Sequence, residues 1–207
     1  MSLLEVDNAA LSLVFDGANK GTLGSSSAEA REYDELQFTL GEGPCLDAVA
    51  EHGLVSVADL SDPVGQRWPG YGPAMLDKQV RGVHALPVVV AGEYVGALAL
   101  FCSTPGELSS QKLGDAAVAA ELAGLHVFDL LDVDLQAAAS DPHSVAWGEL
   151  NALSRTEVSQ ATGMLVAQLG VEPGEALVRL RAHAYATGRP ATDVARAILA
   201  RTLTLEL

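Results

Sequence analysis

Residues 159–199 read SQATGMLVAQLGVEPGEALVRLRAHAYATGRPATDVARAIL, a stretch that predicts three short helices. In the first segment, 154–169, the apolar residues follow the spacing of one helical face: Val158, Ala161, Leu165 and Leu169. Gly170 closes this segment, Pro173 opens the second and Pro190 opens the third, which suits the preference for proline at helix starts and glycine after helix ends. Because each segment is short and has a single apolar stripe, we expect the three to be stable only together, as a bundle with one small core.

Upstream of the bundle, the stretch 83–102, VHALPVVVAGEYVGALALFC, predicts a β-hairpin. Two runs rich in β-branched and apolar residues flank AGE, a short turn that contains glycine. The next stretch, 109–136, predicts a long helix that is apolar on nearly every side. Such a helix has to be covered on two faces. We expect one face to pack on a sheet and the other to meet the partner subunit of a homodimer.

The remaining N-terminal part predicts alternating strands and helices. The expected elements are a strand at 8–15 followed by a hairpin turn, a helix at 27–38, a short helix after Pro44, a strand at 54–60 and a helix from Tyr71 to Gly82. Together with the hairpin and the long helix, these elements predict an α+β fold. The domains are expected at 1–136 and 151–207, with 137–150 as a linker broken at Pro142; a kinked continuation of the long helix is an equally good interpretation.

Composition and charge separate the two domains. The 207 residues are 49% hydrophobic and carry a net charge of −15, but residues 154–207 hold six arginines against five acidic residues. Such asymmetry is typical of two domains with different roles. The start of the chain carries Glu5 and Asp7 where a secretory signal would be basic, and no run reaches the length of a membrane helix. We expect a cytoplasmic protein that does not bind a membrane.

The two parts resemble two known domain families. The stretch ELQFTLGEGPCLDAV, at 35–49, and the hairpin 83–102 resemble a GAF domain, and the series QATGML…LGV…EAL…LRAHA…RP…VA is similar to an ANTAR domain. The resemblance implies a GAF-like sensor with about six antiparallel strands and a three-helix, ANTAR-like output domain. It also implies a dimer that binds paired, dual-loop RNA hairpins in nascent transcripts and prevents terminator formation.

The bundle contains side chains suited to RNA. Arginine pairs with phosphate, and an exposed tyrosine can stack on an unpaired base. The predicted RNA-binding residues are Arg155, Thr162, Arg179, Arg181, Tyr185 and Arg189. Many ANTAR domains carry lysine where this chain has Thr162. Because the N-terminal part is acidic, we expect the RNA-binding face to point away from it.

Three simpler interpretations accompany this prediction. The arginines could form a solvated face with local ion pairs, such as Arg179 with Glu175 four residues before it. Gly163 lies inside a predicted helix and suggests a close backbone approach, for which packing against the neighbouring helix is favoured over contact with RNA. Cys45 follows Gly43 at a helix start, where a thiol can become reactive, but a small buried side chain is the favoured interpretation.

No enzymatic motif accompanies these features. The five histidines are scattered, and neither a phosphate-binding loop nor a nucleophile elbow is present. We expect a non-catalytic protein with no cofactor and no metal, whose sensor domain binds an unidentified small-molecule ligand. The alternative functions are a protein-interaction scaffold whose bundle does not bind RNA and, less favoured, a helix-turn-helix DNA-binding protein with Arg196 and Arg201 on its recognition helix.

Overall fold

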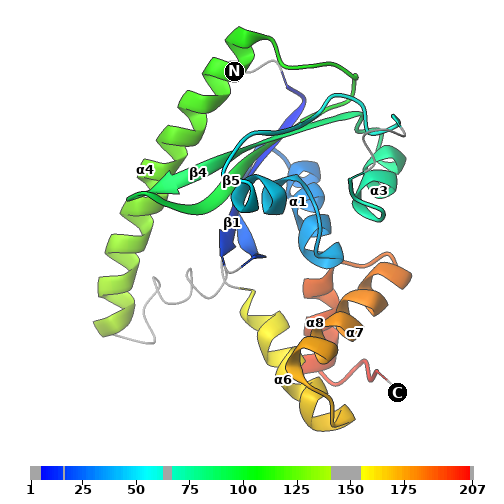
Figure 1. The fold of residues 1–207 in the computed structure, drawn as a ribbon. Coiled ribbons are helices and arrows are strands. Elements are labelled where there is room, and N and C mark those ends of the chain that lie inside the picture. Colours follow the sequence, from blue (N-terminus) through cyan, green and yellow to red (C-terminus); the bar gives the residue numbers. More distant parts are fainter. Residues whose placement is uncertain (1–5, 16, 63–66, 141–154, 206–207) are drawn as a thin grey trace.

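The computed structural model describes residues 6–15, 17–62, 67–140 and 155–205 (Figure 1). Within them, the N-terminal part forms a five-stranded sheet of order β2-β1-β5-β4-β3, in which all neighbouring strands are antiparallel. The strands are β1 (Asn8–Phe15), β2 (Ala18–Ser25), β3 (Val55–Val57), β4 (Gly82–Val90) and β5 (Glu93–Cys102). The described residues therefore contain one strand fewer than the expected six.

The hairpin of β4 and β5 sets the centre of the sheet and confirms the expectation for 83–102. Val90 pairs with Glu93, so that Ala91 and Gly92 alone form the turn. Both have positive φ, 51° at Ala91 and 88° at Gly92. This conformation gives a two-residue turn whose twist matches that of the strands.

Three helices cover one face of the sheet and one long helix covers the other (Figure 1). They are α1 (Ala28–Leu40), α2 (Pro44–Ala50), α3 (Tyr71–Asp77) and, on the opposite face, α4 (Ser110–Ser140). The expectation that α3 reaches Gly82 is wrong, because the chain leaves the helix after Asp77 and takes positive φ at Gln79 before entering β4. Trp68, Tyr71 and Phe101 are buried in the core between the sheet and α1–α3.

Helix α4 approaches the sheet closely on one side and is exposed on the other. Ala116 and Ala120 are buried against β4 and β5. At Gly124 an added Cβ would lie 2.7 Å from the carbonyl oxygen of Val89, so glycine is required for this approach. None of the helices among the described residues is both long and apolar enough to span a membrane.

The C-terminal part is the predicted three-helix bundle. Its helices are α6 (Thr156–Leu169), α7 (Pro173–Ala186) and α8 (Ala191–Leu199). Gly170 caps α6 in the left-handed conformation, as its position after the apolar stripe predicts. The first residues of the expected linker, 137–140, continue α4, and 141–150 lie outside the described residues.

The bundle contacts the N-terminal domain through α1 (Figure 1). Phe38, from α1, is buried in the bundle's own core together with Val158, Leu165 and Leu180. A side chain of the first domain therefore completes the core of the second.

Candidate nucleic-acid interface

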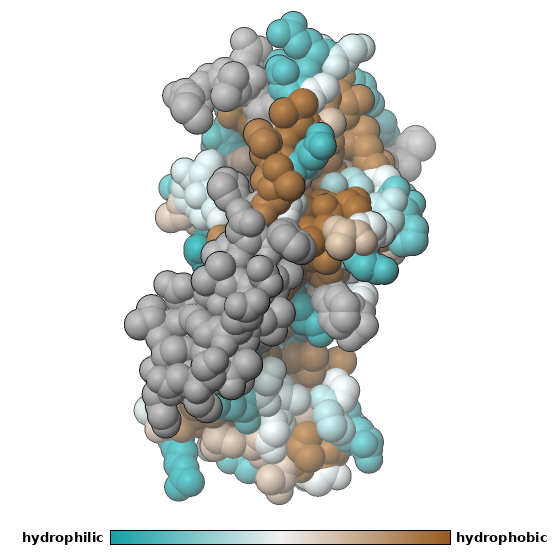
Figure 2. All heavy atoms as spheres, turned by 90° about the vertical axis from the view of Figure 1, so that its left-hand side faces the viewer, coloured by the Kyte–Doolittle hydropathy of each residue, from teal (hydrophilic) through white to brown (hydrophobic). Residues whose placement is uncertain are grey.

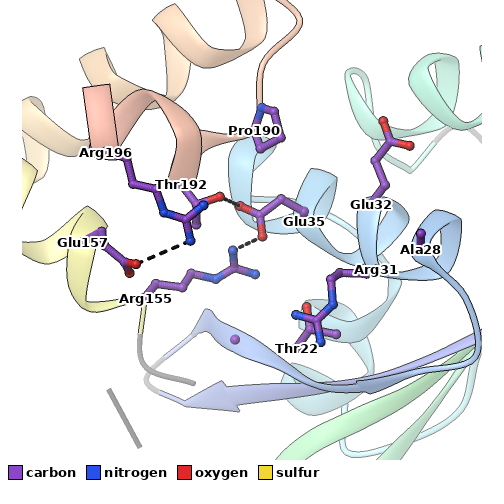
Figure 3. A pocket seen from close by; sticks show the side chains of 11 residues that line it. Thr22, Ala28, Arg31, Glu32, Glu35, Arg155, Glu157, Pro190, Thr192 and Arg196 are labelled. Atoms are coloured by element: carbon purple, nitrogen blue, oxygen red, sulfur yellow. Dashed lines mark hydrogen bonds and ion pairs between the residues drawn. The ribbon is translucent and has the colours of Figure 1, made fainter. Parts of the chain in front are cut away.

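The predicted RNA-binding residues begin with Arg155, which precedes α6. Its backbone has φ of 47°, a conformation that non-glycine residues adopt rarely. Its guanidinium forms an ion pair with Glu35 of α1 (Figure 3), and Nη2 donates a hydrogen bond of 3.2 Å to Asn19 Oδ1. The side chain is only 6% exposed. Arg155 is therefore held by the N-terminal domain in this arrangement.

Arg181, on α7, also contacts α1. Its guanidinium carbon is 4.6 Å from the centre of the Phe38 ring, and that of Arg155 is 4.1 Å from it. Both distances are within the range of cation–π attraction. Burial, and secondarily the charge of Arg155, lowers the pKa of Arg181. One phenylalanine of α1 therefore contacts two of the predicted RNA-binding arginines.

Two further contacts hold α8 to α1. The Thr192 hydroxyl donates a hydrogen bond of 3.1 Å to Glu35 Oε1, so Glu35 contacts both Arg155, before α6, and Thr192, in the first turn of α8 (Figure 3). The backbone N–H of Ala191 donates a longer one of 3.4 Å to Thr39 Oγ1. Because Phe38 and Thr39 follow Glu35 by three and four residues, both lie next to it on the surface of α1. We call these three residues the docking face.

The other predicted residues divide between cavities and the open surface. Arg155, Thr162 and Arg181 line one cavity between the domains, whereas Tyr185 and Arg189 line a second beside α1 and α3. Arg179 instead forms the ion pair of 2.6 Å with Glu175 on the surface, the local pair expected from the spacing. Five of the six predicted residues therefore lie on the side of the bundle that faces the N-terminal domain. The expectation that this face points away from the acidic domain is wrong for this arrangement.

Gly163 and Thr162, both on α6, differ from what the sequence suggested. Gly163 is exposed, and a Cβ built there would have nothing within 4 Å, so the expectation of close packing at Gly163 is wrong. The Thr162 hydroxyl donates to the carbonyl oxygen of Val158 at 2.7 Å, a local bond within α6. A lysine at this position, as in many ANTAR domains, would instead add a charge to the cavity.

A buried polar network connects Arg155 to the sheet. Asp34 is fully buried and accepts hydrogen bonds from Ser12, Thr22, Gln37 and Asn19, the last at 3.0 Å. Burial raises the pKa of Asp34 despite these bonds. Because the Asn19 side chain bonds both Asp34 and Arg155, a change at Asp34 can reach the start of α6 through one residue.

Cys45 lies at the far end of this network and is not suited to thiol chemistry. It is fully buried, and burial, followed by the charge of Asp34, raises the pKa of its thiol to about 12. Its sulfur is within hydrogen-bonding distance of Ser12 Oγ and Gln37 Nε2, each at 3.3 Å. The favoured interpretation of a small buried side chain is therefore confirmed. Cys102, on β5, is half-buried.

The docking face and Asn19 were not among the predicted site residues. The signal in the sequence is Phe38, which lies off the stripe of α1 that faces the sheet core through Ala30 and Tyr33. A large apolar side chain off the main stripe indicates a second contact surface. The partner of that surface could not be read from α1 alone.

Comparison with known proteins assigns the C-terminal part. Residues 151–199 match the ANTAR domain. A search of the curated proteins found no match. Among solved structures, a domain of a putative two-component sensor histidine kinase from Sinorhizobium meliloti 1021 is similar at 15% identity and a TM-score of 0.51, covering 69% of this chain and 89% of that one. Since residues 151–207 are about a quarter of the chain, that shared fold lies largely in the N-terminal domain.

Two further structures have lower scores. A GAF domain from Synechocystis sp., solved in its photoproduct state, is 13% identical with a TM-score of 0.48, covering 67% of this chain and 90% of that one. The GAF domain of a two-component sensor histidine kinase from Bacillus halodurans is 12% identical with a TM-score of 0.45, covering 62% and 85%. Residues 151–199 thus match an ANTAR domain, and the α+β domain before them shares its fold with a domain of a putative two-component sensor histidine kinase.

Proposed function

We propose that this protein is a signal-responsive, non-catalytic cytoplasmic regulator that binds dual-loop RNA hairpins in nascent transcripts and acts as a transcription antiterminator. The ANTAR match carries the proposal, since the ANTAR domain is a family of RNA-binding antitermination regulators. The arginines of the bundle supply groups that pair with phosphate. Tyr185, 57% exposed, can stack on an unpaired base. The signal is a small molecule sensed by the N-terminal domain.

The proposed regulator is a homodimer formed through α4. Val118, Leu122 and Leu125 are 56%, 55% and 60% exposed and recur at helical spacing. Figure 2, which views this side of the molecule, has apolar side chains gathered over it. A second copy of this helix is the occupant we propose, because two bundles held together can bind two RNA loops at once. Linked sites bind far more tightly than single ones.

The docking face supplies a means of control. In the described arrangement Glu35 pairs with Arg155, and the ring of Phe38 contacts both Arg155 and Arg181. Phosphate cannot pair with the Arg155 guanidinium while that group is buried and paired with Glu35. We therefore expect this arrangement to bind RNA weakly and a signal that separates the bundle from α1 to strengthen binding.

An RNA titration of the full chain tests the proposal. A two-loop hairpin is titrated at several salt concentrations against the wild type and the triple variant Arg179→Ala, Arg181→Ala, Arg189→Ala. We expect the triple variant to bind with much lower affinity and to show a shallower salt dependence, by about 0.7–0.9 in the logarithmic slope for each phosphate that is no longer paired. Arg67→Ala, an arginine of the N-terminal domain paired with Asp47, is the control.

Equal affinity for the folded triple variant and the wild type would refute arginine–phosphate recognition. A wild type that binds no hairpin at any salt concentration would favour the alternative of a protein-interaction scaffold. If the wild type does bind the hairpin, RNA capture followed by sequencing identifies the transcripts that it binds.

A further inference from the structure

One cavity between the two domains has a lining whose charged residues are all positive among those that the structure describes. It has a volume of about 390 Å³ and lies between the start of β2, Phe38 of α1, and helices α6 and α7. Its charged lining residues are Lys20, Arg155 and Arg181, and no described aspartate or glutamate lines it. The rest of the lining is mainly apolar, with Ala18, Phe38, Val158 and Leu177, beside the hydroxyls of Ser159 and Thr162.

Two of these cations have no counter-charge in the described part of the chain. Lys20 and Arg181 make no hydrogen bond and no ion pair with any residue that the structure describes. Arg181 is half-buried, and its Nε is fully buried without an acceptor there. A buried charged donor without an acceptor is unfavourable, so such groups normally have a partner.

Arg155 adds to the excess of positive charge. Its ion pair with Glu35 offsets one charge, but its Nε is also buried without an acceptor among the described residues. Burial lowers the pKa of Arg181, and the positive charge of Arg155 lowers it further. An anion placed in the cavity would relieve the repulsion between the two guanidinium groups.

A neighbouring cavity shows that this imbalance is specific. The cavity of about 360 Å³ in Figure 3 shares Arg155 but lies on the side of α8. There three arginines, Arg31, Arg155 and Arg196, meet three glutamates: Glu32, Glu35 and Glu157. Its charges are balanced within the chain, so an anion gains nothing there.

We propose that the cavity lined by Lys20, Arg155 and Arg181 binds a small organic anion, a phosphate or carboxylate group on an apolar body. Guanidinium groups pair with both head groups. The apolar walls select a body larger than the head group, and the volume lies within the range of about 300–1,000 Å³ that ligand pockets occupy. Because Lys20 belongs to the sheet domain and Arg181 to the bundle, the bound anion links the two domains.

Calorimetric titration of the full chain, without RNA, tests this site. The probes are adenosine monophosphate, benzoate, inorganic phosphate and uncharged adenosine. We expect at least one of the two organic anions to bind one per chain, and both inorganic phosphate and adenosine to bind at least about tenfold more weakly. Arg181→Gln and Lys20→Gln should each weaken binding about tenfold or more, whereas Arg196→Gln, which removes the same charge outside this cavity, should leave the Kd unchanged.

The outcomes separate this site from RNA binding. Circular dichroism checks that each variant is folded, and the half-buried Lys20 on β2 provides a variant outside both cores. Equal binding by wild type and both cavity variants overturns the proposal, as does inorganic phosphate binding as tightly as the organic anions. Binding of a short RNA but of none of the small anions overturns it too and assigns these cations to RNA. Binding of an organic anion supports it whether or not the hairpin titration succeeds.

Discussion

At the residue scale, the two arginines of the docking contact are in different electrostatic situations. Arg155 has Glu35 as its partner, and Asn19 ties it to the buried Asp34. Among the described residues, Arg181 has only an aromatic face. A buried guanidinium that has an ion-pair partner stabilises the docked arrangement. A buried guanidinium without one is stabilised by binding an anion. Arg155 therefore holds this face of the bundle to α1, whereas Arg181 remains available to an anion.

Asp34 provides a pH test of the network behind Arg155. Burial raises its pKa above the ordinary 3.8, so the folded protein keeps a proton that the unfolded chain has released. This contribution to the free energy of unfolding therefore falls as pH rises above 3.8 and through the raised pKa. We expect Asp34→Asn to gain stability relative to the wild type over that interval, measured by urea unfolding of both proteins between about pH 4 and 7. A stability difference that does not change with pH would contradict the rise in pKa.

At the element scale, the turn of the β4–β5 hairpin contains a strained backbone position. The turn requires positive φ at two positions, and the chain supplies alanine at the first and glycine at the second. Alanine is strained in this region, whereas glycine and asparagine adopt it readily. The hairpin forms because its long apolar strands pair over nine positions, which outweighs the strain at Ala91.

Substitutions at the turn should act in opposite directions. Ala91→Asn relieves the strain and is expected to raise the free energy of unfolding by about 0.5–1 kcal/mol. Gly92→Ala introduces strain at φ of 88° and should lower it by about 1–2 kcal/mol. Chemical denaturation of both variants measures the effect, and a destabilised Ala91→Asn would show that the turn does not have this conformation in solution.

The exposed stripe of α4 makes a prediction about assembly. Leu122→Glu places a charge in the middle of the stripe and should convert a dimer into a monomer with the 21.4 kDa mass of one chain. Light scattering after size exclusion measures the mass, and Glu121→Gln, at the adjacent exposed position, is the control. A wild type that is already monomeric at high concentration would refute dimerisation through α4.

At the scale of the whole molecule, the central feature is that the C-terminal bundle packs against α1 of the N-terminal domain. The bundle's core includes Phe38 from α1, so its separation exposes an apolar side chain and two arginines together. A ligand that binds only the separated state has to offset the free energy of that separation, so its apparent Kd rises as the fraction of separated molecules falls. In the proposed function, docking therefore controls RNA affinity directly.

Weakening the dock should strengthen RNA binding. Glu35→Gln removes the charge that pairs with Arg155 and leaves a buried guanidinium unpaired, which disfavours the docked arrangement. We expect hairpin affinity to rise about fivefold or more in the titration described above. Glu29→Gln, which removes the same charge from the exposed first turn of α1, should have little effect. Unchanged or weaker affinity for Glu35→Gln would show that docking does not limit RNA binding.

The helices, the hairpin and the bundle were readable in the sequence because they depend on local patterns. The spacing of Val158, Ala161 and Leu165, and the positions of Gly170 and Pro173, determine a helix and its ends without reference to the rest of the chain. The candidate arginines were readable for the same reason, as residue types on a helical face. Their partners were not, since Asn19 and Glu35 are more than 100 positions from Arg155.

The sequence alone therefore determined the fold class, the three-helix bundle and the arginines, because helical and strand periodicity and residue chemistry are properties of neighbouring positions. Only the tertiary structure decided which way the bundle faces, that Phe38 contacts both Arg155 and Arg181, and that Lys20 joins them at one cavity. These contacts follow from packing between surfaces far apart in the chain. No local pattern encodes the distance or the charge of a partner that the chain brings in from elsewhere.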